Sequence, residues 1–410
     1  MHQSNDLKNF ISQALLWVLT IINTTIFLVT RNSFWISNPG QAWLASGGTK
    51  DRTYLASEFE RHLSCYGPFA CLRSGGSFLS QTLIEVTTFA SKATRINLTI
   101  DQKTFIILIG GITWRLLCLG IFVAAIAKLF HSFKVGLLLG NGLVFLLSGL
   151  PLWQLGRLLT NLPLSLSSSF INRANDAFVH MSFSDLIFYD YGFFALVPLI
   201  ALTLSKIKSL SLISSRRFFL IGFVVASFYE AFVPIAFLSL TVFYLLEKKW
   251  PLIKSAWLLL GQLAWTITRI FTLKFTEVAD PQSQFFIGSS FLDFFNYFKT
   301  SNKGISTTSS LPSIAVQLIL ISTLAVTVGF LMGLVANSFK SFKPIDQRSL
   351  RSISAVTSAV SIIVVSSFFR PVYVETGRQS LGLSITLMLF SFSYAQILMS
   401  DGKMKFGVKK

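Results

Sequence analysis

The chain has 410 residues, of which 52% are apolar and 13% are charged, and its mean hydropathy is +0.63. A soluble domain carries about 25% charged residues, so this composition excludes an ordinary soluble globular protein. The formal net charge is +18, but Lys and Arg gather in the termini and in short segments between apolar runs. This pattern is typical of membrane topology and lacks the aromatic interleaving of a nucleic-acid-binding surface. We therefore expect a lipid bilayer as partner, and no nucleic acid.

Apolar runs that could serve as membrane helices recur along the sequence. A helix of about 17–25 residues crosses a bilayer, whereas the strands of a membrane barrel alternate apolar and polar residues over about 10 positions. The runs here are continuous, so the sequence predicts an all-α polytopic transmembrane bundle of about ten spans, a single integral membrane domain over residues 1–410. The expected spans are Ile11–Val29, Thr104–Lys128, Val135–Leu155, Asp185–Ser205, two within Phe218–Leu246, Lys254–Phe271, Ser313–Ala336, Ile353–Phe369 and Ser380–Met399.

The run Phe218–Leu246 is too long for an ordinary span and has basic residues at both ends. Glu230 and Pro234 lie near its centre. We expect a hairpin of two short helices that turns on the outer face, and a single tilted, kinked helix is the alternative.

This arrangement predicts that both termini are cytoplasmic and that residues 30–103, 156–184 and 272–312 form outer loops. Lys128 marks the inner face at the end of the second span. A bacterial inner membrane is the expected location, although the sequon at Asn97 leaves a eukaryotic secretory membrane open. Cys65 and Cys71 in the first outer loop could form a small disulfide ring or remain two free thiols.

The first outer loop holds five of the 17 acidic residues: Asp51, Glu58, Glu60, Glu85 and Asp101. The segment from Asp51 to Leu63 is predicted to be a helix on the membrane surface, because apolar residues recur in it at four-residue spacing. Asp51 and Glu58 stand seven residues apart and so share one face. Such a helix could hold a carboxylate beside the lipid headgroups as a general base, or it could simply be a solvated segment with internal ion pairs.

Two charges fall inside predicted spans, where a charge is costly unless it is paired or faces water. Arg115 lies near the middle of the second span and Glu230 in the predicted hairpin turn. Arg115 could bind a phosphate, or it could pair with Glu230 or Asp190. Arg370 and Arg378 bound a predicted short outer loop, and the planar guanidinium group matches phosphate oxygens well.

The order of these features resembles that of the integral-membrane glycosyltransferases of the GT-C type, which use polyprenyl-phosphate sugars. The stretch TKDRTYLASEFERHLSCYGPFACLRSGGSFLSQTL is similar to the pattern of the bacterial and phage lipopolysaccharide glucosyltransferases, with an early Asp, a later Arg and an amphipathic helix. Asp51 and Arg73 occupy those positions. The stretch SFYEAFVPIAF, around Glu230, resembles a mid-chain hairpin of the same enzymes. Asp51 is followed by Arg52, whereas the family usually shows paired acidic residues.

The resemblance implies inverting transfer of a sugar from a polyprenyl-phosphate carrier to a glycan or lipid acceptor of the cell envelope, on the outer face. Asp51 would be the base, with Glu58 or Glu60 next in order. Arg73, Arg115, Glu230, Arg370 and Arg378 are the candidate substrate-binding residues. Arginines would stabilise the leaving phosphate, so no cofactor is required, although a divalent cation could take part.

Two other classes of function remain open at this stage. The O-antigen-type polymerases and ligases of lipid-linked glycans share the size, the many spans and an arginine-lined outer cavity. A transporter or flippase, or a non-catalytic membrane subunit, would also fit the composition. Motifs of soluble enzymes, such as phosphate-binding glycine loops, zinc-type Cys/His spacing and a nucleophile elbow, are not found in the sequence.

Overall fold

The computed structural model describes residues 11, 13–23, 90, 93–96, 100–147, 195–210, 213–228, 232–247, 252–275, 311–337, 345–368 and 373–400, and for some helical residues only the backbone. Every regular element within these ranges is a helix. The all-helical prediction is therefore confirmed for the part of the chain that is described. The carboxylates Asp51, Glu58 and Glu60 lie outside it, as do Arg73, Glu230 and Arg370.

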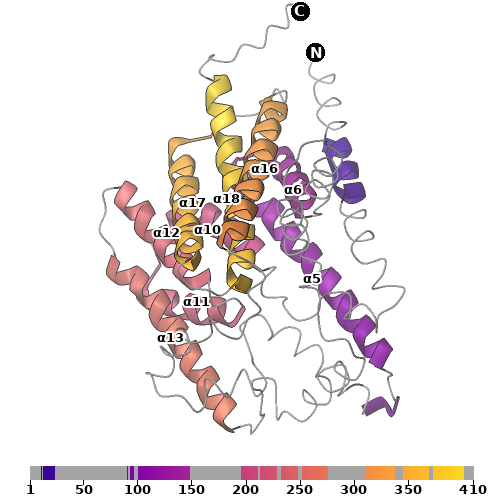
Figure 1. Cartoon of the computed structure of the whole chain (residues 1–410), viewed down its shortest axis with the longest axis vertical. Helices are drawn as coiled ribbons and strands as arrows, with labels where there is room; N and C mark the ends of the chain where they lie inside the picture. Colours follow the sequence, from indigo (N-terminus) through magenta and orange to yellow (C-terminus); the bar gives the residue numbers. More distant parts are fainter. Residues whose placement is uncertain are drawn as a thin grey trace, which may run out of the picture.

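The main helices pack side by side as a bundle (Figure 1). In chain order they are α5 (Ile100–Leu129), α6 (Phe133–Leu147), α10 (Leu196–Leu210), α11 (Ser215–Phe228), α12 (Phe232–Leu246), α13 (Leu252–Phe275), α16 (Leu311–Asn337), α17 (Gln347–Phe368) and α18 (Tyr373–Ser400). Helix α10 contacts α5, α17 and α18, and α18 lies between α16 and α17. A shorter helical stretch, residues 13–23, precedes them.

Two segments of this bundle are long and apolar enough to cross a membrane, Gln347–Val365 and Leu381–Ser400. Shorter apolar helices accompany them: Gln13–Asn23, Phe133–Leu147, Leu196–Ile207, Phe232–Leu246 and Ile321–Asn337. These findings come from the described residues alone, and they support an association with membrane by length and composition.

The run Phe218–Leu246 contains two described helices, α11 and α12. Residues 229–231 between them lie outside the described residues, so the hairpin and the single kinked helix both stay predictions. Pro234 lies in the first turn of α12. Proline is tolerated there because a helix has no internal partner for its first backbone N–H groups.

Several helix ends differ from the sequence-based expectation. α17 begins at Gln347, ahead of the predicted Ile353, because the Asp346 carboxylate accepts a 2.9 Å hydrogen bond from the Ser349 backbone N–H and caps the first turn. α18 begins at Tyr373, so Arg378 belongs to a helix and the prediction that it bounds a loop is wrong. α10 continues to Leu210 and includes Lys206, which was expected to follow the span.

Glycines bring several helix pairs into unusually close contact. In α16, Gly329 and Gly333 stand four residues apart and face the α18 backbone at Met388 and Phe392, where a Cβ atom at either position would collide with a carbonyl oxygen. Gly136 and Gly140 of α6 repeat this spacing against α5. Small residues four apart are the usual means by which membrane helices approach each other, since lipid gives no hydrophobic drive for their association.

Polar side chains also join helices inside the bundle. The Asn141 amide of α6 donates a 2.7 Å hydrogen bond to the hydroxyl oxygen of Thr20, and Asn23 donates a 3.1 Å bond to the Asn141 carbonyl. In α18, the buried Gln396 amide donates to the Gly333 carbonyl of α16. Such interhelical bonds position helices in an apolar environment and each contributes about 0.6 kcal/mol.

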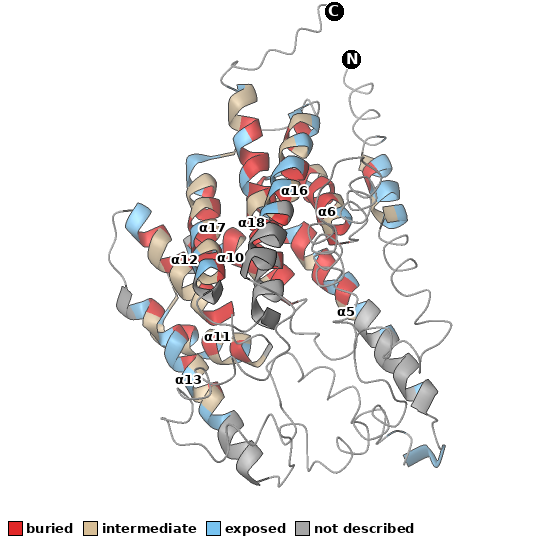
Figure 2. Ribbon diagram, viewed as in Figure 1, coloured by how far each residue is buried: buried red, intermediate tan, exposed pale blue. Residues whose placement is uncertain are grey.

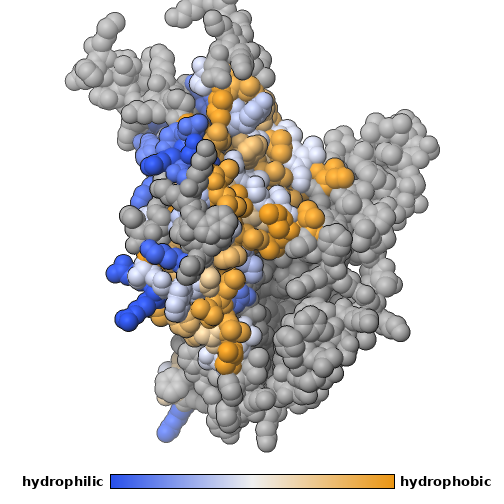
Figure 3. Space-filling view, turned by 90° about the vertical axis from the view of Figure 1, so that its left-hand side faces the viewer, coloured by the Kyte–Doolittle hydropathy of each residue, from blue (hydrophilic) through white to orange (hydrophobic). Residues whose placement is uncertain are grey.

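The core and the outer surface of the bundle are both apolar. Buried residues line the faces that helices turn toward each other (Figure 2). Many large apolar side chains nevertheless lie on the surface, including Leu116, Leu220, Leu263, Leu331 and Val365. Figure 3 shows hydrophobic side chains running along the described surface on one face of the molecule, with hydrophilic side chains gathered toward one side of it. Exposed apolar area of this extent marks a surface that contacts lipid or protein.

Candidate functional site

Arg115 is the predicted site residue whose side chain the structure describes. It is only 4% exposed, whereas the next two residues of α5, Leu116 and Leu117, are 44% and 54% exposed. Cys118, one turn later, and Phe122, two turns later, are fully buried. Side chains three, four and seven residues apart share one face of a helix, so Arg115 belongs to the interior face of α5 and not to its outer surface.

The position of Arg115 along α5 sets its depth in the bundle. It precedes Lys128, near the end of α5, by thirteen residues, which corresponds to about 20 Å at a rise of 1.5 Å per residue. The hydrocarbon core of a bilayer is about 30 Å thick. If Lys128 marks the inner boundary, as the sequence predicts, the guanidinium lies inside the core and nearer to its outer side.

An arginine at this depth carries an energetic cost. Insertion of a central arginine costs about 2.5–3.5 kcal/mol, which is reduced when the side chain turns to the bundle interior and finds a partner. Arg115 meets both conditions, because it is buried and makes an interaction with another residue. A charged side chain kept in the interior of a membrane bundle marks a pathway or a binding site by default.

The guanidinium group of Arg115 is well suited to binding an anion. It remains protonated, and its planar array of five N–H donors matches two oxygens of a phosphate or carboxylate at once. In a low-dielectric interior, such a charge-assisted pair is stronger than in water. The residue is therefore suited to hold an anionic group inside the bundle.

The other predicted site residues are not brought together with Arg115 by the described structure. Glu230 falls between α11, which ends at Phe228, and α12, which begins at Phe232, so it lies outside the described residues. Arg370 falls likewise between α17 and α18. Arg378 is in the second turn of α18, where only the backbone is described. Asp51, Glu58, Glu60 and Arg73 belong to the first loop, beyond the described ranges.

Two carboxylates at helix ends have structural roles. Glu247, just past α12, accepts a 3.0 Å hydrogen bond from the Arg351 guanidinium of α17. Asp346 caps α17. A metal-binding cluster of three or more His, Cys, Asp or Glu is not found in the described part of the chain. Cys118 is a free, buried thiol.

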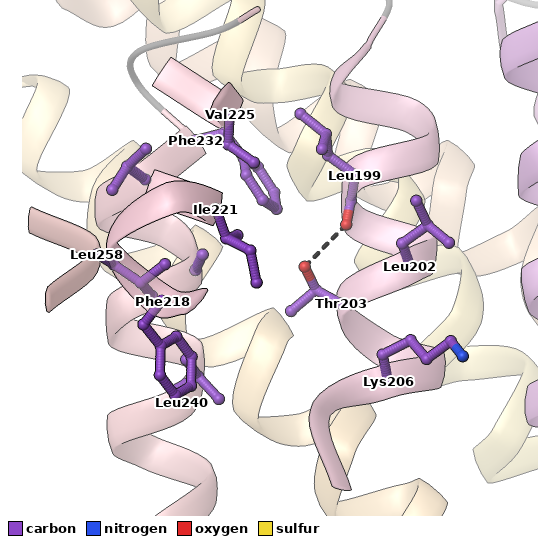
Figure 4. Close-up of a pocket in the computed structure, with 12 residues that line it drawn as sticks. Leu199, Leu202, Thr203, Lys206, Phe218, Ile221, Val225, Phe232, Leu240 and Leu258 are labelled. Carbon is purple, nitrogen blue, oxygen red and sulfur yellow. Dashed lines mark hydrogen bonds between the residues drawn. The ribbon is translucent and has the colours of Figure 1, made fainter. Parts of the chain in front are cut away.

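A second candidate site is a cavity of about 260 Å³ between α10 on one side and α11 and α12 on the other. Figure 4 shows Leu199 and Leu202 of α10 across from Ile221 and Phe218 of α11. The Thr203 hydroxyl donates a 2.8 Å hydrogen bond to the Leu199 carbonyl of its own helix. The lining is therefore almost entirely apolar.

Lys206 is the charged residue that lines this cavity. Figure 4 shows its ammonium group pointing away from Phe218 and Ile221. On the neighbouring helix α5, the exposed Lys128 side chain lies within hydrogen-bonding reach of Lys206. Neither lysine has an acidic partner among the residues described here. The cavity is thus lined by one lysine, Lys206, which lies beside Lys128 of α5.

Comparison with protein-family models, with curated proteins and with solved structures gives no match. Over the residues that it describes, the structure defines an all-helical bundle with two segments able to cross a membrane and a buried arginine.

The lysine pair and the cavity were not predicted from the sequence. Lys128 and Lys206 were interpreted only as topology signals, and no local pattern shows that two helix ends far apart in the chain meet. The four-residue spacing of glycines in α6 and α16 was present in the sequence and would have indicated which faces pack closely.

Proposed function

We propose that this chain is a polytopic integral membrane glycosyltransferase that moves a sugar from a polyprenyl-phosphate carrier to a glycan or lipid acceptor of the cell envelope. Its helices form about ten spans in a bacterial inner membrane, with both termini cytoplasmic and the loop of residues 30–103 outside. The buried guanidinium of Arg115 carries this proposal, because it is a phosphate-binding group kept on the interior face of the helix that follows the loop.

The division of roles follows from the chemistry of the transfer. Asp51 removes the proton of the acceptor hydroxyl as it attacks the anomeric carbon, while the bond to the polyprenyl phosphate breaks. A phosphate leaving group needs little protonation, so it requires cationic stabilisation and no acid. Arg115 stabilises the developing phosphate charge from inside the bundle, and Arg73, Arg370 and Arg378 do so from the outer side.

The close helix packing supports a membrane location for this reaction. Glycine pairs at helix crossings, buried interhelical amide bonds and large exposed apolar side chains are features of helices packed in lipid. A lipid-linked donor carries its phosphate at the headgroups, and a side chain about 20 Å from the inner end of α5 lies in the outer half of the hydrocarbon core, on the side of those headgroups.

Substitution of Arg115 tests the proposal in cells, with the mass spectrum of cell-envelope glycans as readout. Arg115→Gln should abolish the added sugar, and Arg115→Lys should restore only part of it, because a lysine lacks the planar fork. Arg348→Gln, an exposed arginine of α17, is the matched control and should leave the glycan unchanged. A full complement of sugar with Arg115→Gln, at equal protein level, would contradict the proposal.

The carboxylates separate this function from the two alternatives. Under the proposal, Asp51→Asn stops transfer. A polymerase or ligase would be damaged more by Arg370→Ala or Arg378→Ala, and a transporter would tolerate Asp51→Asn but depend on Glu230. If Asp51→Asn, Glu58→Gln and Glu60→Gln each retain full activity, the hypothesis that a carboxylate of the first loop acts as the base is wrong.

A further inference from the structure

We infer that the cavity between α10, α11 and α12 is a binding site for an anionic phospholipid of the inner leaflet, with one acyl chain in the cavity and the phosphate at Lys128 and Lys206. This inference depends on the bilayer placement of the bundle and not on the sugar transfer itself. The ligand of this site is a phospholipid, with a phosphodiester headgroup joined to a saturated or unsaturated hydrocarbon chain.

The shape and lining of the cavity favour a hydrocarbon chain. Its volume of about 260 Å³ is bounded by Leu199, Leu202, Phe218, Ile221, Val225 and Leu240 among other apolar residues. The Thr203 hydroxyl within it is satisfied by its own helix, so the lining offers a ligand little polar contact. Leu202 both lines the cavity and is exposed on the outside of the bundle, so the space opens laterally. A lipid chain could enter by that side without passing through water.

The lengths also agree with an acyl chain whose headgroup is at the inner face. Lys206 and Leu199 are seven residues apart on α10, which places Leu199 about 10 Å deeper than Lys206. One leaflet contributes about half of the 30 Å hydrocarbon core. The cavity therefore holds the part of an acyl chain nearest to its headgroup, with the remainder extending along the bundle surface.

The charge at the mouth favours an anionic headgroup over a zwitterionic one. Lys128 and Lys206 repel each other, and the described carboxylates Glu247 and Asp346 are engaged in an ion pair and a helix cap. A phosphate between the two ammonium groups would replace this repulsion with two charge-assisted bonds. Each lysine near an anionic membrane surface contributes about fivefold in affinity.

The full-length protein, purified and delipidated in neutral detergent, can be titrated with phosphatidylglycerol or phosphatidylcholine carrying the same acyl chains and followed by native mass spectrometry. Phosphatidylglycerol should bind at least about tenfold more tightly. The double variant Lys128→Gln/Lys206→Gln should lose about 30-fold in affinity for phosphatidylglycerol and with it the preference. Ala236→Phe, which fills the cavity, should weaken binding of both lipids.

A matched control removes the same charge elsewhere. Arg217→Gln/Lys254→Gln changes two exposed cations at the starts of α11 and α13, outside the cavity lining, and should retain the preference for phosphatidylglycerol. Equal affinity for the two lipids, or an equal loss in both double variants, would overturn the inference. So would tight binding of a polyprenyl phosphate with none of phosphatidylglycerol, or full competition by inorganic phosphate. None of these lipid-binding results depends on the mass spectrum of cell-envelope glycans. Failure of the lipid-binding inference can therefore be told apart from failure of the proposed sugar transfer.

Discussion

The crossing of α16 with α18 and the space between α10 and α11 are built from similar apolar helices and are packed in opposite ways. At the first, Gly329 and Gly333 let the two backbones touch, and Gln396 bonds across the contact. At the second, α10 presents Leu199 and Leu202 and has no glycine, so bulky side chains keep the helices apart and a cavity remains.

This contrast shows that side-chain size at the contact decides how closely these helices pack. Close approach is available only where small residues allow backbone contact, and elsewhere the helices stand off and enclose space. The tight crossing is a structural element. The open region encloses about 260 Å³ and is lined by Lys206, which lies beside Lys128.

The largest expected effect is at the tight crossing. Gly329→Ala should lower the free energy of unfolding by about 3 kcal/mol, because its Cβ would meet the Met388 carbonyl oxygen and backbone cannot move aside. Gly120→Ala is the matched control on α5, where a Cβ meets nothing within 4 Å, and it should stabilise by about 1 kcal/mol. Thermal unfolding in detergent measures both, and equal effects would remove the contrast between the regions.

A smaller loss is expected for the amide bond across the same crossing. Gln396→Leu keeps the volume and removes the donor to Gly333, which should cost about 0.6 kcal/mol. Ser393→Ala is the control, because the buried Ser393 hydroxyl donates a 2.8 Å hydrogen bond to the Leu389 carbonyl of its own helix. If Ser393→Ala lowers the free energy of unfolding as much as Gln396→Leu does, the bond between helices stabilises the protein no more than a bond within one helix.

The ion pair between Glu247 and Arg351 joins α12, which borders the cavity, to α17, which packs on α18. Glu247 is 12% exposed and Arg351 39% exposed, so solvent screens the pair and its coupling should be about 0.5 kcal/mol. A double-mutant cycle with Glu247→Gln and Arg351→Gln measures this coupling. It should fall as salt is raised, and a coupling that does not respond to salt would contradict a screened ion pair.

The smallest effect is expected inside the cavity. Ala236→Leu adds volume where space exists, so the free energy of unfolding should stay within about 0.5 kcal/mol of the wild-type value. Ala325→Leu adds the same atoms at a fully buried position of α16 and should cost about 2 kcal/mol. Equal costs would show that the region around α10 is as tightly packed as the crossing.

The helix positions could be predicted because continuous apolar runs define them. α5, α13 and α16 begin and end within a few residues of the expected spans. The helix ends that the sequence did not predict are formed by polar residues. Asp346 caps α17 seven residues before its predicted apolar run begins at Ile353, and α18 extends through Glu375 and Arg378 before its own apolar run. Hydropathy does not predict a helix cap or a polar first turn, because neither changes the apolar run.

The candidate site was predictable only in part. The position of Arg115 within a span follows from hydropathy, and its burial follows from its place on the face of Cys118 and Phe122. The meeting of Lys128 with Lys206 depends on how α5 and α10 pack. Contacts of this kind are set by side chains far apart in the sequence, so local patterns do not contain them.

The central claim is tested most directly by the mass spectrum of cell-envelope glycans from three strains: wild type, a strain without the gene, and a strain whose chromosomal copy carries Asp51→Asn. We expect one hexose to be missing from the same glycan in both altered strains, with the Asp51→Asn protein present in the membrane at the wild-type level. Identical spectra in all three strains, or a sugar lost without the gene but retained with Asp51→Asn, would contradict the claim that Asp51 catalyses sugar transfer.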